Sequence, residues 1–327
     1  MREYSRAIDP FRNGSVNSCK GKAQGLINLF LSMVKLLGYR LRGGRLLHIH
    51  YAGRGSWKRE NMLASYGRLL GYKTLMHCHC NISELADHQG LEEVRGKLKK
   101  ADANIVLAQS YKEFSERELG LDKVSVVANF VSTAEVPAGK ADSKAAPVFL
   151  YLGLLSEAKG FYDLIESCAR LARGGVQFKL IAGGAGDMDK VRELISKNGL
   201  EDYIELPGWI RGPEKEKAFR RADVLVLPSY SEGMPMVVIE ALQHGLAVIG
   251  TEVGAVPDMV EDPKNGIIVQ PGDVDALTAA MKQLAEDKPA LAAFSKSARE
   301  KGLDYTAAEV LPILSEIYDK VLDCQKK

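Results

Sequence analysis

Two glutamates separated by seven residues, Glu232 and Glu240, stand in the stretch EGMPMVVIE and bracket the start of a predicted helix. The loop Ser229–Gly233 consists of turn-forming residues, and Pro235 occupies the position of a first helical residue. Free amide groups and the helix dipole make such a helix start a binding site for anions. A carboxylate pair beside it suits a ligand that carries hydroxyl groups as well as phosphates.

The same pair also fits a structural interpretation, in which Glu240 lies on the solvated strip of its helix and Glu232 complements the helix dipole. The segment Gly254–Pro257 weighs against this interpretation, because it follows the next predicted strand and brings a second glycine turn to the same edge of the sheet. Two glycine turns and two acids at one edge are better explained by a bound ligand.

The elements around this loop follow from the apolar pattern. Val224–Leu227 is a short apolar run closed by Pro228, and it predicts a buried parallel strand. Met236–Gln243 predicts a helix, and Ala247–Gly250 predicts the next strand. The loop therefore lies at the carboxyl end of a parallel strand, which is where α/β proteins bind ligands.

Lys159 stands in a second loop of this kind, after the predicted strand Val148–Leu152 and between Gly153 and Gly160. A cation in that position can neutralise a diphosphate, and the glycines let the backbone approach it. A solvated surface lysine is the alternative. Because this loop shares a sheet edge with Glu232, we expect Lys159 to serve a ligand.

Gly183, Gly184 and Gly186 form another glycine turn, after the predicted strand Phe178–Ala182. This turn is not a dinucleotide fingerprint, because its pattern is G-x-G-x-x-D and no acid follows about 20 residues later at a second strand end. The D-x-D at Asp187–Asp189 sits at a predicted helix start, and we interpret it as capping that helix and complementing its dipole.

The stretch EGMPMVVIE, followed by TEVGAVPDMVED and NGIIVQPGD, resembles the E-x7-E signature of retaining glycosyltransferases of family 4, the group 1 family, of the bacterial polysaccharide type. The resemblance extends over residues 146–311 and more faintly over the first half. It implies an α/β fold of GT-B architecture, with two Rossmann-like doubly wound domains facing a cleft. Family members open with a strand, a glycine-rich loop and a helix, which this chain lacks, so we expect either a first domain shortened at its N-terminus or an incomplete chain.

The resemblance assigns a role to each matching residue. Glu240 is similar to the acid that binds the ribose of the nucleotide, Glu232 to the acid that contacts the donor sugar, and Lys159 to the lysine that binds the diphosphate. Where the family has an arginine beside that lysine, this chain has Leu154. The implied donor-binding set consists of Gly153, Lys159, Gly183, Gly184, Trp209, Glu232, Gly233, Met234, Pro235 and Glu240.

The implied catalytic residues are Glu232, Lys159 and His79, where His79 matches the family's histidine at a strand end facing the cleft. The predicted loop Gly53–Glu60, GRGSWKRE, resembles a stretch that faces the acceptor in bacterial polysaccharide enzymes. From it we expect acceptor-side contacts by Arg54, Ser56 and Arg59.

The resemblance implies transfer of a sugar, with retention of configuration, from a nucleoside-diphosphate sugar to a saccharide or lipid-linked acceptor in surface polysaccharide synthesis. No cofactor and no metal are expected if Lys159 and the helix amides stabilise the leaving diphosphate. The alternatives are a nucleotide-sugar epimerase of the same architecture, a glycoside hydrolase that uses the two glutamates, and a nucleotide-sugar-binding protein with little turnover. Leu154 and the short N-terminus are the reasons for the last alternative.

The segment His77–Cys80 reads HCHC and raises the question of a metal site. Alternate residues of a strand point to opposite faces, so only the two histidines or the two cysteines can converge. The sequence offers no second cluster of ligands next to them, and we therefore expect no metal site here.

The β-α alternation and a length of 327 residues predict two domains, at 1–140 and 147–305, followed by a C-terminal helix in 306–327 that returns to the first domain. Residues 135–146 are interpreted as the linker between the two domains. The first recognisable strand is Leu46–His50.

Charge differs between the two halves, because residues 1–145 carry 23 basic and 14 acidic side chains and the rest carry 21 and 28. A basic half can face an anionic membrane, whereas the lack of interleaved aromatic residues argues against nucleic acid. Gly25–Tyr39 is interpreted as a helix covering the sheet, with a helix on a membrane surface as the alternative. The five unpatterned cysteines and the absence of an apolar leader predict a cytoplasmic location, with peripheral membrane contact as an extension of it.

Overall fold

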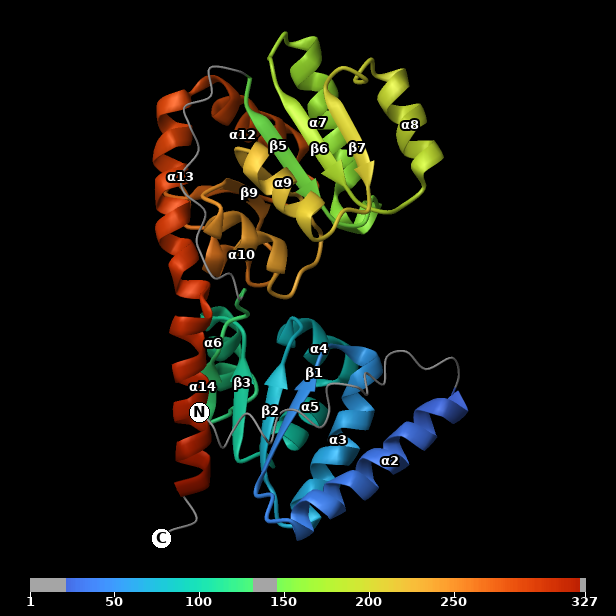
Figure 1. Cartoon of the computed structure of the whole chain (residues 1–327), viewed down its shortest axis with the longest axis vertical. Helices are drawn as coiled ribbons and strands as arrows, with labels where there is room; N and C mark the ends of the chain where they lie inside the picture. Colours follow the sequence, from blue (N-terminus) through green and yellow to red (C-terminus); the bar gives the residue numbers. More distant parts are fainter. Residues whose placement is uncertain (1–21, 132–145, 324–327) are drawn as a thin grey trace. The chain divides into compact units, whose positions relative to one another are not determined.

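The computed structural model describes residues 22–131 and 146–323, so the predicted linker lies almost entirely outside the described residues. The described chain divides into two compact units. The second unit runs from Asn129 to Val310, and the first unit holds the described residues on either side of it. The chain therefore passes back into the first unit within its last helix. Figure 1 colours the chain along its sequence.

The first unit contains a four-stranded sheet in which every strand is parallel to its neighbours. Its strands follow the order of the sequence, and they are β1 (Leu46–Tyr51), β2 (Lys73–Cys78), β3 (Ala103–Val106) and β4 (Val124–Val126). Parallel neighbours need a crossover between them, and helices supply it here. These helices are α3 (Arg54–Leu69), α4 (Ile82–Gln89), α5 (Leu91–Leu98) and α6 (Gln109–Arg117).

Helix α3 begins at Arg54, which corrects the prediction of a loop over Gly53–Glu60. Gly53, with φ of 102°, makes the turn out of β1 in the left-handed region that glycine adopts readily. The side chain of Trp57 is completely buried, and it anchors the first turns of the helix to the core. The glycine and the charged residues of GRGSWKRE suggested a loop, and burial of Trp57 outweighs that local signal.

Helix α2 (Lys22–Leu41) packs against α3 and lies outside it, as Figure 1 shows. Its contact side contains the buried side chains of Leu29 and Leu36, and the Tyr72 hydroxyl donates a 2.7 Å hydrogen bond to the Leu36 carbonyl. The prediction that this helix covers the sheet is wrong, because its partner is a helix. None of the helices in the described ranges has the length and hydropathy needed to cross a bilayer.

The second unit contains a six-stranded parallel sheet in the order β10-β9-β8-β5-β6-β7. In this order the chain starts in the middle of the sheet with β5 and adds β6 and β7 on one side. It then crosses over and adds β8, β9 and β10 on the other side, which is doubly wound topology. The strands are β5 (Val148–Leu152), β6 (Lys179–Gly183), β7 (Ile204–Gly208), β8 (Val224–Leu227), β9 (Ala247–Thr251) and β10 (Gly266–Val269).

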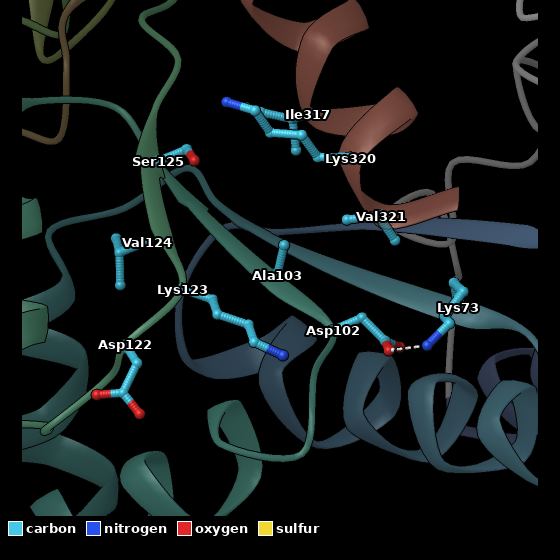
Figure 2. Close-up of a pocket in the computed structure, with 10 residues that line it drawn as sticks. All are labelled: Lys73, Asp102, Ala103, Asp122, Lys123, Val124, Ser125, Ile317, Lys320 and Val321. Carbon is cyan, nitrogen blue, oxygen red and sulfur yellow. Dashed lines mark hydrogen bonds and ion pairs between the residues drawn. The ribbon is translucent and has the colours of Figure 1, made fainter. Parts of the chain in front are cut away.

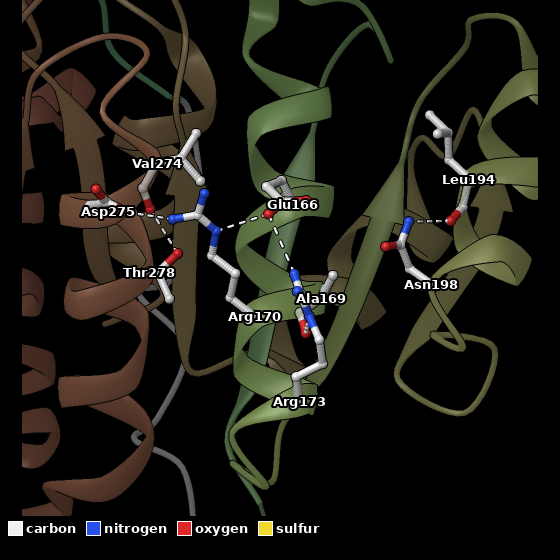
Figure 3. A network of polar contacts seen from close by, with 9 residues as sticks. All are labelled: Glu166, Ala169, Arg170, Arg173, Leu194, Asn198, Val274, Asp275 and Thr278. Atoms are coloured by element: carbon white, nitrogen blue, oxygen red, sulfur yellow. Dashed lines mark hydrogen bonds and ion pairs between the residues drawn. The ribbon is translucent and has the colours of Figure 1, made fainter.

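Helices cover this second sheet, and buried aromatic side chains from β5, α7 and the start of β6 form much of its core. Arg170 of α7 joins Glu166 of the same helix to Asp275 of α12, so that an exposed ionic network ties the two helices together (Figure 3). The helices are α7 (Phe161–Arg173), α8 (Met188–Lys197), α9 (Pro213–Arg221), α10 (Met236–Gln243), α11 (Val256–Met259), α12 (Val274–Glu286) and α13 (Lys288–Gly302), with short 3-10 turns at Glu157–Lys159 and Leu303–Tyr305.

The predicted strand, loop and helix around the two glutamates are confirmed, with one correction at the helix start. Helix α10 begins at Met236, and Pro235 is the capping residue before it, with φ of −70° and ψ of 119°. Pro235 is thus extended and not helical. The expected cap on α8 is confirmed, since the Asp187 carboxylate accepts a hydrogen bond from the Lys190 amide.

The last helix, α14 (Ala307–Asp323), buries Ile317, Tyr318 and Val321 in the first unit. Beside it, at the amino ends of β2, β3 and β4, is a cavity of about 310 Å³ (Figure 2). Lys73 and Asp102 form a 2.8 Å ion pair at its wall. This edge of the sheet is opposite to the carboxyl ends at which ligand-binding residues were predicted, and no predicted site residue lines the cavity.

Candidate functional site

The site in the second unit lies where the strand order reverses. Strands β5 and β8 are neighbours in the sheet, although three helices and two strands separate them in the sequence. The loops that follow them therefore leave the carboxyl edge side by side and turn in opposite directions. Ligands of doubly wound sheets bind in the crevice that this arrangement creates.

Lys159 and Glu232 come from these two loops and are in direct contact. The Lys159 ammonium donates to Glu232 Oε1 over 2.7 Å and to the Ser231 carbonyl over 3.1 Å. The Ser229 hydroxyl donates to the same carboxylate oxygen over 2.7 Å. The Glu232 side chain is 12% exposed and that of Lys159 is 29% exposed, so that both can meet a ligand from solution. The structure thus brings into contact two residues that were predicted to share a sheet edge, with Ser229 as an addition.

Two glycines let the loops of this edge pack closely. Gly160 has φ of 62°, and a Cβ atom there would collide with the Pro228 carbonyl oxygen at the end of β8. A Cβ atom on Gly184 would collide with the Gly153 carbonyl oxygen. Both positions therefore require glycine for loop-to-loop packing, which is a structural reason independent of any phosphate.

Glu240 has a partner that the sequence did not reveal. Lys215 of α9 donates to both carboxylate oxygens of Glu240, at 2.7 and 2.6 Å. His244, one turn further along the helix, contacts the Glu240 carbonyl and Glu216 of α9. Lys215 lies 25 residues before Glu240, so no local pattern could have paired them. Glu240 is therefore held in a charge-paired position at the edge of the site and is not simply solvated.

The Glu232 loop is fastened from both sides. The side-chain amide of Asn129 donates to the Met234 carbonyl over 3.2 Å, and the Ala255 amide donates to the Gly233 carbonyl over 2.8 Å. The Thr251 hydroxyl at the end of β9 donates to the Ser229 carbonyl over 2.6 Å. The turn at Gly254–Pro257 thus holds the Glu232 loop in place. A ligand would meet a preformed loop here.

Two exposed apolar side chains lie at the same carboxyl edge of the sheet, one in the Lys159 loop and one after another strand. Leu154 is 52% exposed at the place of the family's usual arginine, and Trp209, after β7, is 57% exposed. The exposed ring of Trp209 offers a flat surface for stacking. The buried Tyr151 has its pKa raised by burial first and by the neighbouring Glu232 carboxylate second.

The predicted acceptor residues of the first unit lie at the start of α3. Arg54 is the first residue of the helix. The Ser56 hydroxyl accepts from the Ala52 amide over 3.1 Å, so it stabilises the turn between β1 and α3. Arg59 pairs with its neighbour Glu60 over 2.9 Å. These contacts are local, and they assign Ser56 a structural task in the turn.

His79 follows β2 and belongs to a group of four histidines, which we call the histidine cluster: His48, His50, His77 and His79. His50 and His79 are hydrogen-bonded through Nδ1 and Nε2 at 2.7 Å. His48 and His77 are hydrogen-bonded through Nε2 and Nδ1 at 3.2 Å, and the Tyr318 hydroxyl contacts His48 Nδ1 at 2.7 Å. The rings are 4.2 Å apart between His48 and His50 and 4.1 Å apart between His77 and His79.

The statement that the HCHC segment has no second ligand cluster beside it is wrong. Strand β1 carries His48 and His50 on the face shared with His77, and pairing of the strands sets His50 directly opposite His77. Alternation along a strand puts His77 and His79 on one face, and it equally puts His48 and His50 of β1 on one face. The signal for a second pair of ligands was therefore present in the sequence. Cys78 and Cys80, by contrast, contact each other, with 3.6 Å between their sulfurs, and both are free thiols.

The histidine cluster favours uncharged rings. Burial lowers the pKa of His48 and of His77, and the neighbouring histidines lower both further. The pKa of His50 falls to about 4, through burial first and then the proximity of His79. These three rings are therefore neutral near pH 7.

Comparison with known proteins places the second unit in a family. The model of the family described as glycosyl transferases group 1 matches residues 133–301. WcaL of Escherichia coli K12, provisionally assigned to colanic acid biosynthesis as a glycosyltransferase, is 37% identical over 157 residues. That match covers 45% of this chain and 38% of WcaL, so the chain spans less than half of the length of this relative in the match.

Solved structures share the fold of both units. Sucrose-phosphate synthase from Thermosynechococcus elongatus gives a TM-score of 0.78 at 20% identity, over 94% of this chain and 81% of that one. HepE of Anabaena, solved in complex with UDP, gives a TM-score of 0.73 at 17% identity, over 93% and 84%. Two parallel α/β sheets of this kind are the GT-B architecture, and the predicted fold class is confirmed.

Proposed function

Because the chain belongs to the group 1 glycosyl transferases, we propose that it transfers a sugar from a nucleoside-diphosphate sugar to a saccharide or lipid-linked acceptor during surface polysaccharide synthesis. The observation that carries this proposal is the Lys159–Glu232 contact at the point where the strand order of the second sheet reverses. The similarity to WcaL, whose assignment to colanic acid biosynthesis is provisional, supports the polysaccharide context. The UDP complex of HepE supports a nucleotide as ligand of this fold.

Lys159 is proposed to bind the diphosphate of the donor. An ammonium group has three N–H donors, and the Ser231 carbonyl and Glu232 take two of them among the described contacts. The third can reach a phosphate oxygen without loss of the other two. As the bond to the sugar breaks, negative charge grows on the departing diphosphate, and a fixed cation stabilises that charge most in the transition state.

The two carboxylates are proposed to bind hydroxyl groups. Glu232 would accept hydrogen bonds from the donor sugar, and Glu240 from the ribose, while Lys215 holds the Glu240 side chain in one orientation. Gly233, Met234 and Pro235 present backbone beside them in a loop that is already fixed. Such preorganisation lowers the entropy cost of binding the donor.

His79 of the first unit is proposed to be a catalytic residue, and Arg54 and Arg59 are proposed to contact the acceptor. Leu154 leaves the diphosphate with one cation fewer than the family pattern provides. Retention of configuration and independence from a metal at the donor site are part of this proposal. Both rest on the E-x7-E resemblance together with Lys159 as the charge-neutralising group.

The test is to incubate the full chain with UDP-, GDP-, ADP-, CDP- and TDP-sugars and a bacterial lipid extract as the source of acceptor. We expect release of one nucleoside diphosphate together with a glycosylated lipid, and an NMR spectrum in which the anomeric configuration of the donor is retained. A sugar that is only epimerised would favour the epimerase alternative. Tight binding of a nucleotide-sugar without release of diphosphate would favour the binding-protein alternative.

We also propose that α2 rests on an anionic membrane, which would keep the protein at the inner face of the cytoplasmic membrane, near a lipid-linked acceptor. Lys35 and Arg42 are exposed basic residues on or next to the helix. Exposed apolar side chains and nearby positive charge together are what surface binding requires. The exposed apolar side chains of α2 are Ile27, Phe30, Leu31, Val34, Leu37 and Leu41.

Co-sedimentation with vesicles tests this location. We expect the chain to bind vesicles that contain phosphatidylglycerol, and binding to fall for Phe30→Ser and for Val34→Ser. The matched control is Met62→Ser, an exposed apolar residue on α3 outside this face. Equal binding by all three variants would contradict the proposal.

A further inference from the structure

Two His-x-His pairs on adjacent parallel strands put four imidazoles on one face of the first sheet. His48 and His50 are two residues apart on β1, and His77 and His79 are two residues apart at the end of β2. The register pairs His50 with His77, which fixes both pairs to the same face. Three rings on two rigid neighbouring strands form an arrangement that proteins use to bind transition metals through nitrogen.

The distances suit a metal ion after a small adjustment of the rings. One ring nitrogen each from His48, His50 and His77 lies within 4.8 Å of the other two. In a tetrahedral zinc site with Zn–N bonds of about 2.0–2.1 Å, ligand nitrogens are about 3.3 Å apart. The His48–His77 pair, at 3.2 Å, already has that spacing. His50 must rotate toward them and give up its hydrogen bond to His79, and it is the most exposed of the three side chains.

The surroundings give one ring a fixed orientation. The Tyr318 hydroxyl contacts His48 Nδ1 at 2.7 Å, which directs Nε2 of the same ring toward His77. An outer hydrogen bond of this kind is the usual companion of a metal-bound histidine, because it sets the orientation of the ring. Burial favours the neutral form of the rings, which is the form that offers a lone pair.

We propose that the first unit binds one divalent transition-metal ion of the zinc class through His48, His50 and His77. All three ligands are imidazoles, and imidazole nitrogens favour zinc, nickel and copper over magnesium or calcium. The fourth position is open to water or to His79, whose ring is hydrogen-bonded to His50. This site belongs to the first unit and adds to the proposed sugar transfer, whose leaving group is served by Lys159 in the second unit.

The competing interpretation is a histidine network that holds no ion. Its hydrogen bonds already satisfy most of the ring nitrogens, and such a network would stabilise the sheet by itself. The two interpretations differ in one measurable way, because only the first predicts a stoichiometric ion with nitrogen ligands.

Titration of the full chain with Co²⁺ distinguishes them. We expect one Co²⁺ per chain, with the intense visible bands of a four-coordinate ion and without the near-ultraviolet charge-transfer band of a cobalt thiolate, and we expect Zn²⁺ to displace it. His50→Ala should weaken binding by about tenfold or more, which is at least the effect of disturbing a supporting contact. His50 is exposed, so this variant leaves the core intact.

Two control variants complete the experiment. His88→Ala removes an exposed histidine of α4 outside the cluster and should leave binding unchanged. Cys80→Ser should also leave binding unchanged. The proposal is overturned if no stoichiometric ion binds, if His50→Ala binds as well as the unmodified chain, or if Cys80→Ser abolishes binding. Activity plays no part in this readout, so failure of the metal site and failure of the proposed transfer remain distinguishable.

Discussion

The polar groups of the two units are neutralised in different ways. In the second unit each predicted carboxylate contacts a lysine from another element, Glu232 with Lys159 and Glu240 with Lys215. In the first unit the imidazoles of the histidine cluster contact one another, and lowered pKa values keep His48, His50 and His77 uncharged. One unit thus presents paired charges at its sheet edge, and the other presents neutral nitrogen.

This difference separates the ligands that the two units can bind. A lysine next to a carboxylate can donate its remaining N–H to a phosphate oxygen while the carboxylate accepts a hydrogen bond from a hydroxyl group. Neutral imidazoles offer phosphate no positive charge and only one N–H donor each, whereas their lone pairs can bind a metal ion or a proton. The donor-binding proposal therefore rests on the second unit, and the metal proposal on the first.

The largest effect is expected from removal of the cation at the donor site. Lys159→Ala should lower kcat for sugar transfer by about 100-fold or more, in the range found when one electrostatic donor is removed from an active site. The measurement is steady-state release of nucleoside diphosphate. Lys190→Ala is a suitable control, because Lys190 is a lysine of the same unit whose ammonium lies over the Tyr162 ring. Equal kcat values for Lys159→Ala and the control would show that the charge of Lys159 does not contribute to transfer. The paired charges of the second unit would then have no catalytic significance.

The second carboxylate should act mainly on binding. Glu240→Ala should raise the Kd of the nucleoside diphosphate about tenfold, because a hydrogen bond to a charged group contributes about 1.5–3 kcal/mol. Lys215→Ala should have a smaller effect in the same direction, since Lys215 positions Glu240. Calorimetry of the two single variants and the double variant measures their coupling, and strictly additive effects would show that Lys215 acts independently.

The histidine cluster should make stability depend on pH. His48, His50 and His77 have a lower pKa in the folded chain than the value of 6.5 for an unperturbed histidine, so the unfolded chain binds more protons below that pH. Stability is therefore complete above about pH 6.5 and falls with acidification, by about 2 kcal/mol at pH 5 for a ring that stays neutral. Urea unfolding at pH 7 and pH 5 should show a smaller loss for His77→Gln than for the unmodified chain. An equal loss would mean that His77 titrates normally.

The smallest effect is expected from a carboxylate that has no lysine partner in the described contacts. Asp187 caps α8 through the Lys190 amide, so Asp187→Ala should cost about 1 kcal/mol of stability. Turnover should stay unchanged, because a cap does not bind donor. If kcat fell and stability did not, the D-x-D would have to be treated as part of the site.

Most helices and strands of the second unit could be predicted, because short stretches of its sequence determine them. Runs such as Val224–Leu227 and Met236–Gln243 have the length, apolar content and flanking breakers that fix an element within a few residues. Lys159 and Glu232 could be predicted together because the carboxyl ends of neighbouring parallel strands meet at one edge. Lys215 could not, because its approach to Glu240 depends on how α9 packs.

In the first unit, local signals misled at two places. The charged, glycine-containing start of α3 suggested a loop, whereas a buried tryptophan makes it helical. The histidine cluster needed the register between β1 and β2, although the alternation within each strand was already visible. Residue type and spacing therefore revealed candidate chemistry, and pairing between strands decided which candidates meet.

The most direct test of the donor site is thermal unfolding of the chain with UDP, GDP, ADP, CDP, TDP and NAD, repeated for Lys159→Ala and Glu240→Ala. A ligand that binds only the folded state raises Tm in proportion to the logarithm of its concentration relative to Kd, once its concentration is well above Kd. We predict that one nucleoside diphosphate raises Tm of the unmodified chain and that both substitutions abolish or greatly reduce the rise. Stabilisation by NAD alone, or by no nucleotide, would contradict the account.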